Sequence, residues 1–429
     1  MLDLFARHLV GHHQHDAVAL GNADLGKAEA DGSLKPGGTI VEATAGNTGL
    51  GLAQVGILKG YKLLLVVPDK MAREKIQHLR AMGVDVRITR SDVGKGHPEY
   101  YQDMAEKLAA ETPGAFYANQ FSNPSNPAAH ERTTGPEIWE QLGQDVDAVV
   151  VGVGSGGTLT GLGRYFAEIS PKTEMVLADP VGSVLCDFIA TGKFGAAGSW
   201  AVEGIGEDFI PSIADLSNVR TGYTIDDEVS FRTARELLKR EGLLAGSSTG
   251  TLLAAALRHC RAQTTPKRVV TFVCDTGTRY LSKVYNDSWM FDQGLLHRST
   301  VGDLRDLISR RVVDEAVISV TPDDTLLTAF QRMRAADISQ VPVLQDGKLA
   351  GLLDESDLLM HVSADSERFR QPVRQAMNRQ LRTLRPDAGL QALITTLQEG
   401  WVAVVADADG FYGLITRFDL LNYLRKTLA

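Results

Sequence analysis

The sequence predicts an α/β protein whose core contains doubly wound, mostly parallel sheets, followed by two small α/β repeats. Short apolar runs alternate with helical stretches from Ala23 to about Met290, a pattern typical of parallel strands covered by helices on both faces. Several apolar runs end in glycine-rich turns, where sheets of this kind bind ligands. From about Thr300 the pattern changes to a repeated segment.

Length and composition narrow the class of protein. The chain has 429 residues, enough for two or three domains, with 44% hydrophobic and 23% charged residues. Its net charge of −9 argues against nucleic acid as a partner. We find no apolar run of bilayer length and no secretory signal, so we expect a cytoplasmic protein. Cys186, Cys260 and Cys274 are odd in number and far apart, so we expect reduced, buried thiols and no metal site.

The core elements follow from the local pattern of apolar residues. Buried strands are expected at 39–42, 62–68, 85–89, 148–153, 174–179 and 268–274. Helices are expected at 23–32, 50–58, 73–82, 100–111, 137–142, 230–241 and 252–259.

Residues 1–22 differ from the rest of the chain. Four of the ten histidines lie here, at positions 8, 12, 13 and 15, and no periodicity continues past Val10. A small metal site or an affinity-like tract is one interpretation. We favour a disordered or mis-specified N-terminus.

The C-terminal region contains an internal repeat. Residues 351–359 resemble residues 413–421, and 320–330 resemble 384–393. Gly351 and Gly413 are 62 residues apart, as are Asp357 and Asp419. A repeat of this length predicts two copies of one small unit packed on each other.

Four turns rich in glycine and small hydroxyl residues punctuate the core, at 44–49, 152–161, 241–251 and 273–282. The first two follow strands and open helices, so their backbone amides and hydroxyls can surround an anion such as a carboxylate or phosphate. Each turn taken alone could be a helix cap or a tight connection.

Taken together, these motifs resemble the cystathionine β-synthase family of fold-type II pyridoxal-phosphate enzymes, to which the cysteine synthases are related. The resemblance rests on ThrAlaGlyAsnThrGly (44–49), GlySerGlyGlyThr (154–158), GluGlyIleGlyGluAspPhe (203–209), GlySerSerThrGly (246–250) and CysAspThrGly (274–277), in this order, with the segments 68–76 and 126–138. The C-terminal repeats resemble a Bateman pair. The resemblance implies a catalytic core at 23–296 and regulatory repeats at 297–363 and 364–429.

The resemblance also implies roles for individual residues. Residues expected to bind pyridoxal phosphate are Asn47, Gly154, Ser155, Gly156, Gly157, Thr158 and Ser248. Residues expected to bind the amino-acid substrate are Thr44, Ala45, Gly46, Thr48 and Gln120. Ala45 stands where the family usually has serine, so one hydroxyl donor is lost. A neutral hydroxyl at Ser248 would leave the pyridine nitrogen unprotonated, which suits β-elimination.

The implied reaction is β-replacement, in which L-serine and L-homocysteine give L-cystathionine. One alternative is a cysteine synthase that uses O-acetylserine and sulfide. Another is a catalytically degenerate homologue that binds an adenosyl ligand.

The second alternative arises because the family attaches its cofactor to a lysine in a GlySerXaaLysAspArg segment. In register, that position falls near Ala17, and no LysAspArg is present. Lys27 and Lys35 are placed unsuitably to replace it. The sequence therefore offers no catalytic lysine, and we favour an incorrect N-terminus over a degenerate enzyme.

The repeats carry a candidate effector site. In the resembling modules, a hydroxyl residue three positions before an aspartate helps to hold ribose and phosphate. The second repeat has Thr416 and Asp419, whereas the first has Asp354, whose charge would repel phosphate. We expect S-adenosylmethionine or an adenine nucleotide at the second repeat, or no ligand at all. A homodimer or higher homo-oligomer is expected.

Overall fold

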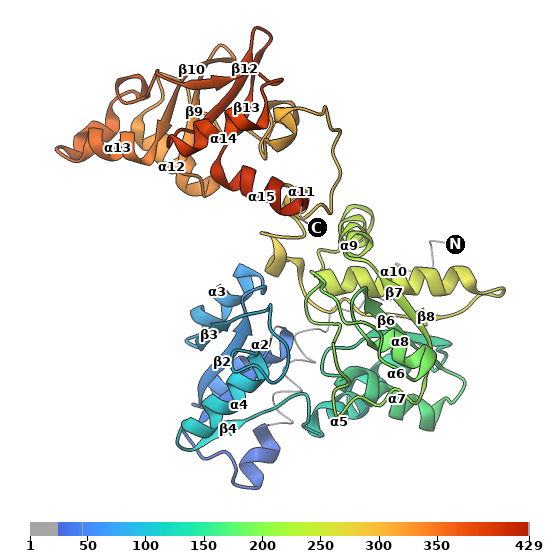
Figure 1. The fold of residues 1–429 in the computed structure, drawn as a ribbon. Helices are drawn as coiled ribbons and strands as arrows, with labels where there is room; N and C mark the ends of the chain where they lie inside the picture. The colour runs from blue at the N-terminus through green and yellow to red at the C-terminus, as the bar shows by residue number, and fades with distance from the viewer. Residues whose placement is uncertain (1–24, 45, 428–429) are drawn as a thin grey trace. The chain divides into compact units, whose positions relative to one another are not determined.

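The computed structural model describes residues 25–44 and 46–427. The chain divides into two compact units, Met1–Trp289 and Met290–Ala429 (Figure 1). The histidine-rich residues 1–22, position 17 and Ala45 lie outside the described residues.

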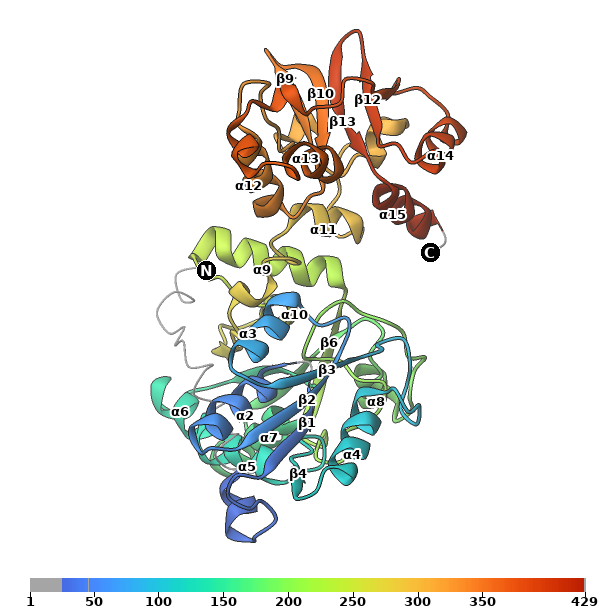
Figure 2. The ribbon, with the colours of Figure 1, turned by 90° about the vertical axis from the view of Figure 1, so that its left-hand side faces the viewer.

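The first sheet of the first unit is fully parallel, with the order β3-β2-β1-β4. Its strands are β1 (Thr39–Ala43), β2 (Lys62–Pro68), β3 (Asp85–Thr89) and β4 (Ala115–Tyr117). Helices α2 (Asn47–Leu58) and α3 (Arg73–Ala81) pack on one face, and α4 (Tyr101–Glu111) packs on the other. Figure 2 shows β1 and β2 between α2 and α4.

The second sheet is also fully parallel, with the order β7-β6-β5-β8. Its strands are β5 (Ala148–Gly152), β6 (Glu174–Pro180), β7 (Val219–Ile225) and β8 (Val269–Val270). The surrounding helices are α5 (Ser125–Arg132), α6 (Thr134–Gln141), α7 (Gly157–Ile169), α8 (Leu185–Thr191), α9 (Asp227–Glu241) and α10 (Ser247–Ala262). The predicted α/β architecture is therefore confirmed.

Two details of the prediction are wrong. The strand expected at 268–274 is only β8, because the chain then leaves the sheet to meet the helix α10, where the Cys274 amide donates to Thr249 Oγ1 at 2.9 Å. β4 and β7 were not predicted. β4 has three residues, and β7 alternates buried and exposed residues instead of forming an apolar run.

The second unit contains two similar α/β halves. The first has α12 (Leu326–Ala336), the antiparallel strands β9 (Gln340–Gln345) and β10 (Lys348–Asp354), and α13 (Glu355–Val362). The second has β11 (Arg382–Leu384), α14 (Leu390–Gln398), β12 (Ala403–Asp407), β13 (Gly410–Ile415) and α15 (Arg417–Thr427). α11 (Asp287–Asp292) spans the boundary between the units. Short 3-10 helices lie in the connecting segments: η1 (Gly277–Tyr280), η2 (Leu304–Leu307), η3 (Val312–Asp314), η4 (Ser366–Arg370) and η5 (Val373–Gln375).

The two halves exchange segments at the repeated glycines. Residues 304–308 precede the first half, but Leu304 and Ile308 are buried in the core of the second. A Cβ at Gly413 would lie 2.5 Å from Ile308 Cγ2, so glycine makes room for this segment. At Gly351 a Cβ would lie 2.9 Å from the carbonyl oxygen of Asn378, which precedes the second half. The repeated glycines therefore mark reciprocal contacts.

The cysteines are free thiols, but each is only partly buried, contrary to the expectation of full burial. Helices in the described ranges are too short or too polar to cross a membrane.

Candidate active site

A cavity of about 410 Å³ lies in the first unit, beside the carboxyl ends of β1 and β5. Its walls come from the turn after β1, the glycine-rich turn after β5, the first turn of α10 and the segment 203–208. All predicted site residues of the first unit that the structure describes line this cavity, which brings together segments far apart in the sequence.

The turn after β1 supplies small hydroxyls. Thr44 is buried and accepts a hydrogen bond from the Gly46 amide at 3.1 Å, which leaves the Thr44 proton for a ligand. Thr48 Oγ1 instead donates to Gln120 Oε1 at 2.7 Å. Gln120 Nε2 donates in turn to the Ala43 carbonyl at 3.0 Å, which fixes the orientation of the amide.

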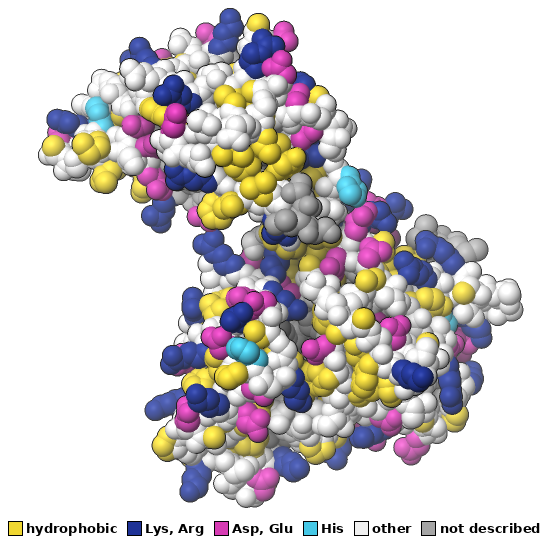
Figure 3. All heavy atoms as spheres, viewed as in Figure 1, with side chains coloured by type: hydrophobic (Ala, Val, Ile, Leu, Met, Phe, Trp, Pro, Cys, Tyr) yellow, Lys and Arg dark blue, Asp and Glu magenta, His cyan; other side chains and the backbone are white. Residues whose placement is uncertain are grey.

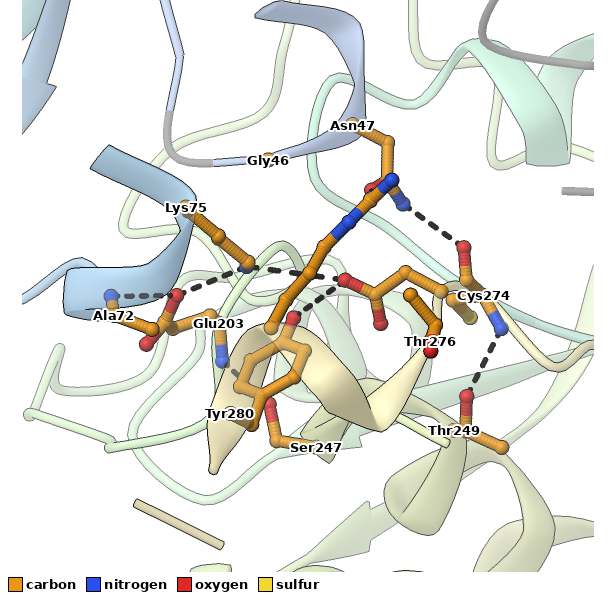
Figure 4. Close-up of polar contacts among 12 residues, drawn as sticks. Gly46, Asn47, Ala72, Lys75, Glu203, Ser247, Thr249, Cys274, Thr276 and Tyr280 are labelled. Atoms are coloured by element: carbon orange, nitrogen blue, oxygen red, sulfur yellow. Dashed lines mark hydrogen bonds and ion pairs between the residues drawn. The ribbon is translucent and has the colours of Figure 1, made fainter. Parts of the chain in front are cut away.

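Asn47 is held from both ends of its amide. Its Nδ2 donates to the Cys274 carbonyl at 2.9 Å, and Arg279 Nη1 donates to its Oδ1 at 2.6 Å (Figure 4). These two hydrogen bonds fix the orientation of the Asn47 amide at the start of α2.

The glycine-rich turn after β5 forms a cradle at the start of α7. Gly156 has φ +88°, and no side chain of the described residues caps the helix, so its first amides remain available to an anion. Ser155 Oγ accepts from Asn126 Nδ2 at 2.9 Å, and Thr158 Oγ1 lies 3.2 Å from His130 Nε2. Burial lowers the pKa of His130 to about 4, so this histidine is neutral near pH 7.

Positions 154 and 157 of this turn have room only for glycine. A Cβ at Gly157 would lie 1.8 Å from Asn126 Oδ1, and one at Gly154 would lie 2.5 Å from the Gly204 carbonyl oxygen. The donors, the uncapped helix start and the absence of side chains suit a phosphate group. Asn126 and His130 belong to the 126–138 segment of the resemblance, but no individual role was predicted for either residue.

Ser248 lies in the first turn of α10, buried at the cavity wall. Its neighbour there is Cys274. Burial raises the pKa of the Cys274 thiol to about 12, and a hydrogen bond from Ser248 opposes this increase. Ser248 therefore presents a neutral hydroxyl beside a thiol that is un-ionised near pH 7.

A buried cluster of charges borders the cavity and was not anticipated from the sequence. Lys75 Nζ lies 2.9 Å from Glu203 Oε2 and 3.9 Å from Asp275 Oδ2, and Tyr280 donates to Asp275 at 2.7 Å (Figure 4). Lys283 Nζ lies 2.5 Å from the other oxygen of Glu203. Burial opposes ionisation of Glu203, but the two lysines hold its pKa below the ordinary value. The cluster joins α3 to the segment between β6 and β7 and to the segment that follows β8.

Two lysines of the described residues line the cavity, Lys70 and Lys75. Lys27 and Lys35 are exposed and lie outside the lining, in agreement with the view that they are unsuitable for cofactor attachment.

The predicted effector residues meet in the second unit. Thr416 Oγ1 donates to Asp419 Oδ2 at 2.6 Å, and Ser309 hydrogen-bonds to the other oxygen of Asp419. In the first half, Asp354 caps α13 by accepting from the Asp357 amide at 2.7 Å. Thr416 also accepts from the Asp419 amide at 3.3 Å. The position is therefore a helix cap in both halves, and only the second half has a hydroxyl there.

Comparison with known proteins agrees with this fold and site. Residues 16–275 match the family model of pyridoxal-phosphate dependent enzymes, and residues 304–364 and 373–426 match the CBS domain. A solved structure titled as an O-acetylserine dependent cystathionine β-synthase from Helicobacter pylori matches with a TM-score of 0.58 and 37% identity. It covers 63% of this chain and 85% of that one. These matches define the class: an enzyme fold that uses pyridoxal phosphate, with a CBS pair.

Curated relatives narrow the class. Cystathionine β-synthase of Apis mellifera is 34% identical over 93% of this chain and 81% of its own length. Cystathionine β-synthase of Dictyostelium discoideum is 32% identical over 95% of this chain and 84% of its own. Cysteine synthase A of Escherichia coli K12 is 41% identical, over 59% of this chain and 79% of its own. The chain belongs to the cystathionine β-synthase family. Since these relatives are all named as synthases, the interpretation as a degenerate homologue gains no support.

Proposed function

We propose that this protein catalyses a pyridoxal-phosphate-dependent β-replacement that joins L-serine, or its O-acetyl derivative, to L-homocysteine and forms L-cystathionine. The supporting observation is the extent of the similarity. Cystathionine β-synthases align with both the core and the C-terminal pair, whereas the aligned region of cysteine synthase A covers 59% of the chain.

Each group of site residues would bind a different part of the cofactor or the substrate. Bound pyridoxal phosphate withdraws electrons from the α-carbon of the substrate amino acid, which acidifies the α-hydrogen so that its loss can expel the group on the β-carbon. The cradle at 154–158 would hold the phosphate through amides and hydroxyls, and Asn47 would orient the ring. Ser248 would meet the ring nitrogen without protonating it. Thr44 would donate to the substrate carboxylate, together with Ala45, Gly46 and Thr48 of the same turn and with Gln120, which follows β4 and accepts from Thr48.

Assays with four substrate pairs test the proposal. The protein is supplied with pyridoxal phosphate and with L-serine or O-acetylserine, each paired with L-homocysteine or sulfide, and the products are identified by mass spectrometry. We expect cystathionine from the homocysteine pairs. Turnover restricted to O-acetylserine and sulfide would instead make the protein a cysteine synthase, the candidate that the 41% identity over the core favours.

We also propose that the repeats at 297–363 and 364–429 bind an adenosyl ligand, S-adenosylmethionine or an adenine nucleotide, at Thr416 and Asp419. The second half offers a hydroxyl there, whereas the first half offers the carboxylate of Asp354.

A homo-oligomer forms part of this proposal. Figure 3 shows hydrophobic side chains gathered on the second unit. Met360 of α13 is 78% exposed and Phe418 of α15 is 77% exposed, and Leu359 and Leu421 are exposed beside them. Apolar surface of this kind favours self-association.

A further inference from the structure

The outer strand of the first sheet has one side that no described strand pairs with. β3 ends the sheet, with β2 as its neighbour (Figure 1). The Thr89 carbonyl accepts from the Asp69 amide at 2.8 Å, just beyond β2, so the backbone of Thr89 faces β2. Because the backbone groups of successive residues in a strand point to opposite sides, the N–H and C=O groups of Val86 and Ile88 point outward. Such an edge is a template for a further strand.

A pocket of about 430 Å³, the edge pocket, lies along this strand. Besides β3, its walls include Arg80 near the end of α3 and Met104, Lys107 and Leu108 of α4. Since α3 and α4 cover opposite faces of the sheet, the pocket borders the edge from both faces. This arrangement suits an extended chain, whose side chains alternate between two faces.

The two faces of β3 differ in chemistry. Val86 packs against the apolar cluster to which α3 contributes, so Val86 and Ile88 point to the α3 face. Ile88 is 47% exposed, which leaves apolar surface available there. Arg87 lies between these two residues and therefore points to the opposite face, which α4 covers.

The charges of the edge pocket favour an anionic ligand. Its basic residues are Arg80, Arg87 and Lys107, whereas its acidic residue is Glu111. Arg87 pairs with Asp85 at 2.9 Å, and Lys107 pairs with Glu111 at 3.8 Å, but all four side chains are more than half exposed. Pairs between exposed side chains are weak, so both cations can exchange their partners for carboxylates of a ligand.

We propose that the β3 edge binds an extended acidic peptide of a partner protein, which adds to the first sheet as a further strand. The peptide backbone bonds to the outward groups of Val86 and Ile88. Acidic side chains at every second position meet Arg87 and Lys107 on the α4 face, and apolar side chains between them meet Ile88 on the α3 face. None of the residues that line the edge pocket lines the catalytic cavity, so this binding is independent of the proposed reaction.

The first test measures the charge contribution with a fluorescein-labelled peptide in which glutamate and valine alternate. We expect saturable binding to the full chain by fluorescence anisotropy. The double variant Arg87→Glu, Lys107→Glu should weaken it by at least about 10-fold, because two attractive charges become repulsive. The matched control is Arg232→Glu, Arg240→Glu on α9, which changes the net charge equally at exposed positions. It should change the affinity by less than about 3-fold.

The second test measures backbone pairing with two N-methylated forms of the peptide, one methylated on its glutamates and the other on its valines. Amides of a paired strand alternate between its two sides, so one form should bind at least about 10-fold more weakly than the other. Loss in the valine form would indicate an antiparallel strand, and loss in the glutamate form a parallel one.

A variant of the protein tests the same hydrogen bonds from the other partner. Ile88→Pro removes the outward N–H and leaves the ladder with β2 intact, so it should weaken binding of the unmodified peptide more than Ile88→Ala does. Circular dichroism checks that both variants fold, and the methylated peptides test the pairing in the unmodified protein if Ile88→Pro does not.

Three results would overturn this assignment. The first is an absence of binding at millimolar peptide, and the second is equal weakening by the α9 control. The third is equal affinity of the two methylated peptides, which would indicate ionic adsorption without strand pairing. A change of oligomeric state in Arg87→Glu, Lys107→Glu, measured by sedimentation, would show that a second copy of the chain covers the edge and would also overturn it.

Discussion

The ammonium of Lys75 and the carboxylate of Glu203 form an ion pair at 2.9 Å, and the two side chains are only 1% and 2% exposed. The pair joins α3 to the segment that carries Glu207. Removal of one partner leaves the other charge buried, which is costly.

Lys75→Met should therefore destabilise the first unit by about 3–5 kcal/mol, measured by urea unfolding near pH 7. Glu203 would keep Lys283, so the loss would fall at the lower end if that lysine compensates. Lys59→Met, which removes an ion pair with Glu29 at the surface, should leave the unfolding midpoint unchanged. An unaltered midpoint in Lys75→Met would show that the buried pair does not stabilise the fold.

Asp179 predicts a particular dependence of stability on pH. It is fully buried, and burial raises its pKa from 3.8 to about 6. The folded state therefore holds this proton more tightly than the unfolded state. Its contribution to stability is present below pH 4 and is lost as the pH rises through about 6, by about 3 kcal/mol in total.

Asp179→Asn removes the carboxyl group, so the variant has no ionisation at this position. Urea unfolding from pH 4 to pH 8 should show the unmodified protein losing stability relative to the variant by about that 3 kcal/mol. A difference between the two proteins that stays constant with pH would contradict the assignment.

The glycine cradle predicts loss of cofactor without loss of fold. Gly157→Ala would place a methyl group against Asn126, so we expect retention of pyridoxal phosphate after desalting to fall by at least about 10-fold. Gly163→Ala lies on the same helix, where the nearest atom would be 3.7 Å from the new carbon. It should bind cofactor normally. Equal binding by both variants would remove the cradle from the site.

Attachment of the cofactor can be mapped by borohydride reduction and peptide mass spectrometry. We expect no reduced adduct on Lys27 or Lys35, which are exposed away from the cavity. We also expect none on Lys75, because Glu203 and Asp275 hold its ammonium. An adduct on Lys75 would identify it as the attachment site and overturn this expectation.

The candidate effector site in the second unit leads to a prediction about ligand binding. Thr416→Val removes the hydroxyl bound to Asp419 and should weaken binding of S-adenosylmethionine or ATP by at least about 10-fold in calorimetry. Asp354→Asn retains a side chain able to cap α13 and should not change that affinity. Equal affinities for Thr416→Val and the unmodified protein would place the ligand elsewhere.

Local sequence patterns predicted much of the fold because apolar runs and glycine turns are local signals. β2 and β3 have the predicted bounds, and the turns after β1 and β5 open helices as expected. β7 was not predicted because one of its faces is exposed, so its sequence contains no continuous apolar run.

The glycine-rich turns of the site were predicted from the sequence. The buried ion pairs beside them were not, because they depend on tertiary contacts. Lys75 and Glu203 are 128 residues apart and meet only after the sheets assemble. The burial of Lys75 has no local signature in α3, a helix of mixed polarity, and Glu203 lies outside the regular elements. Glu207 lies within the motif GluGlyIleGlyGluAspPhe (203–209), but its burial in the cavity wall is visible only in the folded structure.

The reciprocal contacts at Gly351 and Gly413 bear on how the second unit acquires its structure during synthesis. Leu304 and Ile308 emerge from the ribosome about 100 residues before β13, against which they pack. The apolar side chains of Leu304 and Ile308 therefore stay exposed during synthesis until β13, the last strand of the second unit, has been made. A fragment that begins at residue 364 would lack part of its own interior. The two halves are thus a single cooperative folding unit, and a ligand bound in one half would stabilise the other.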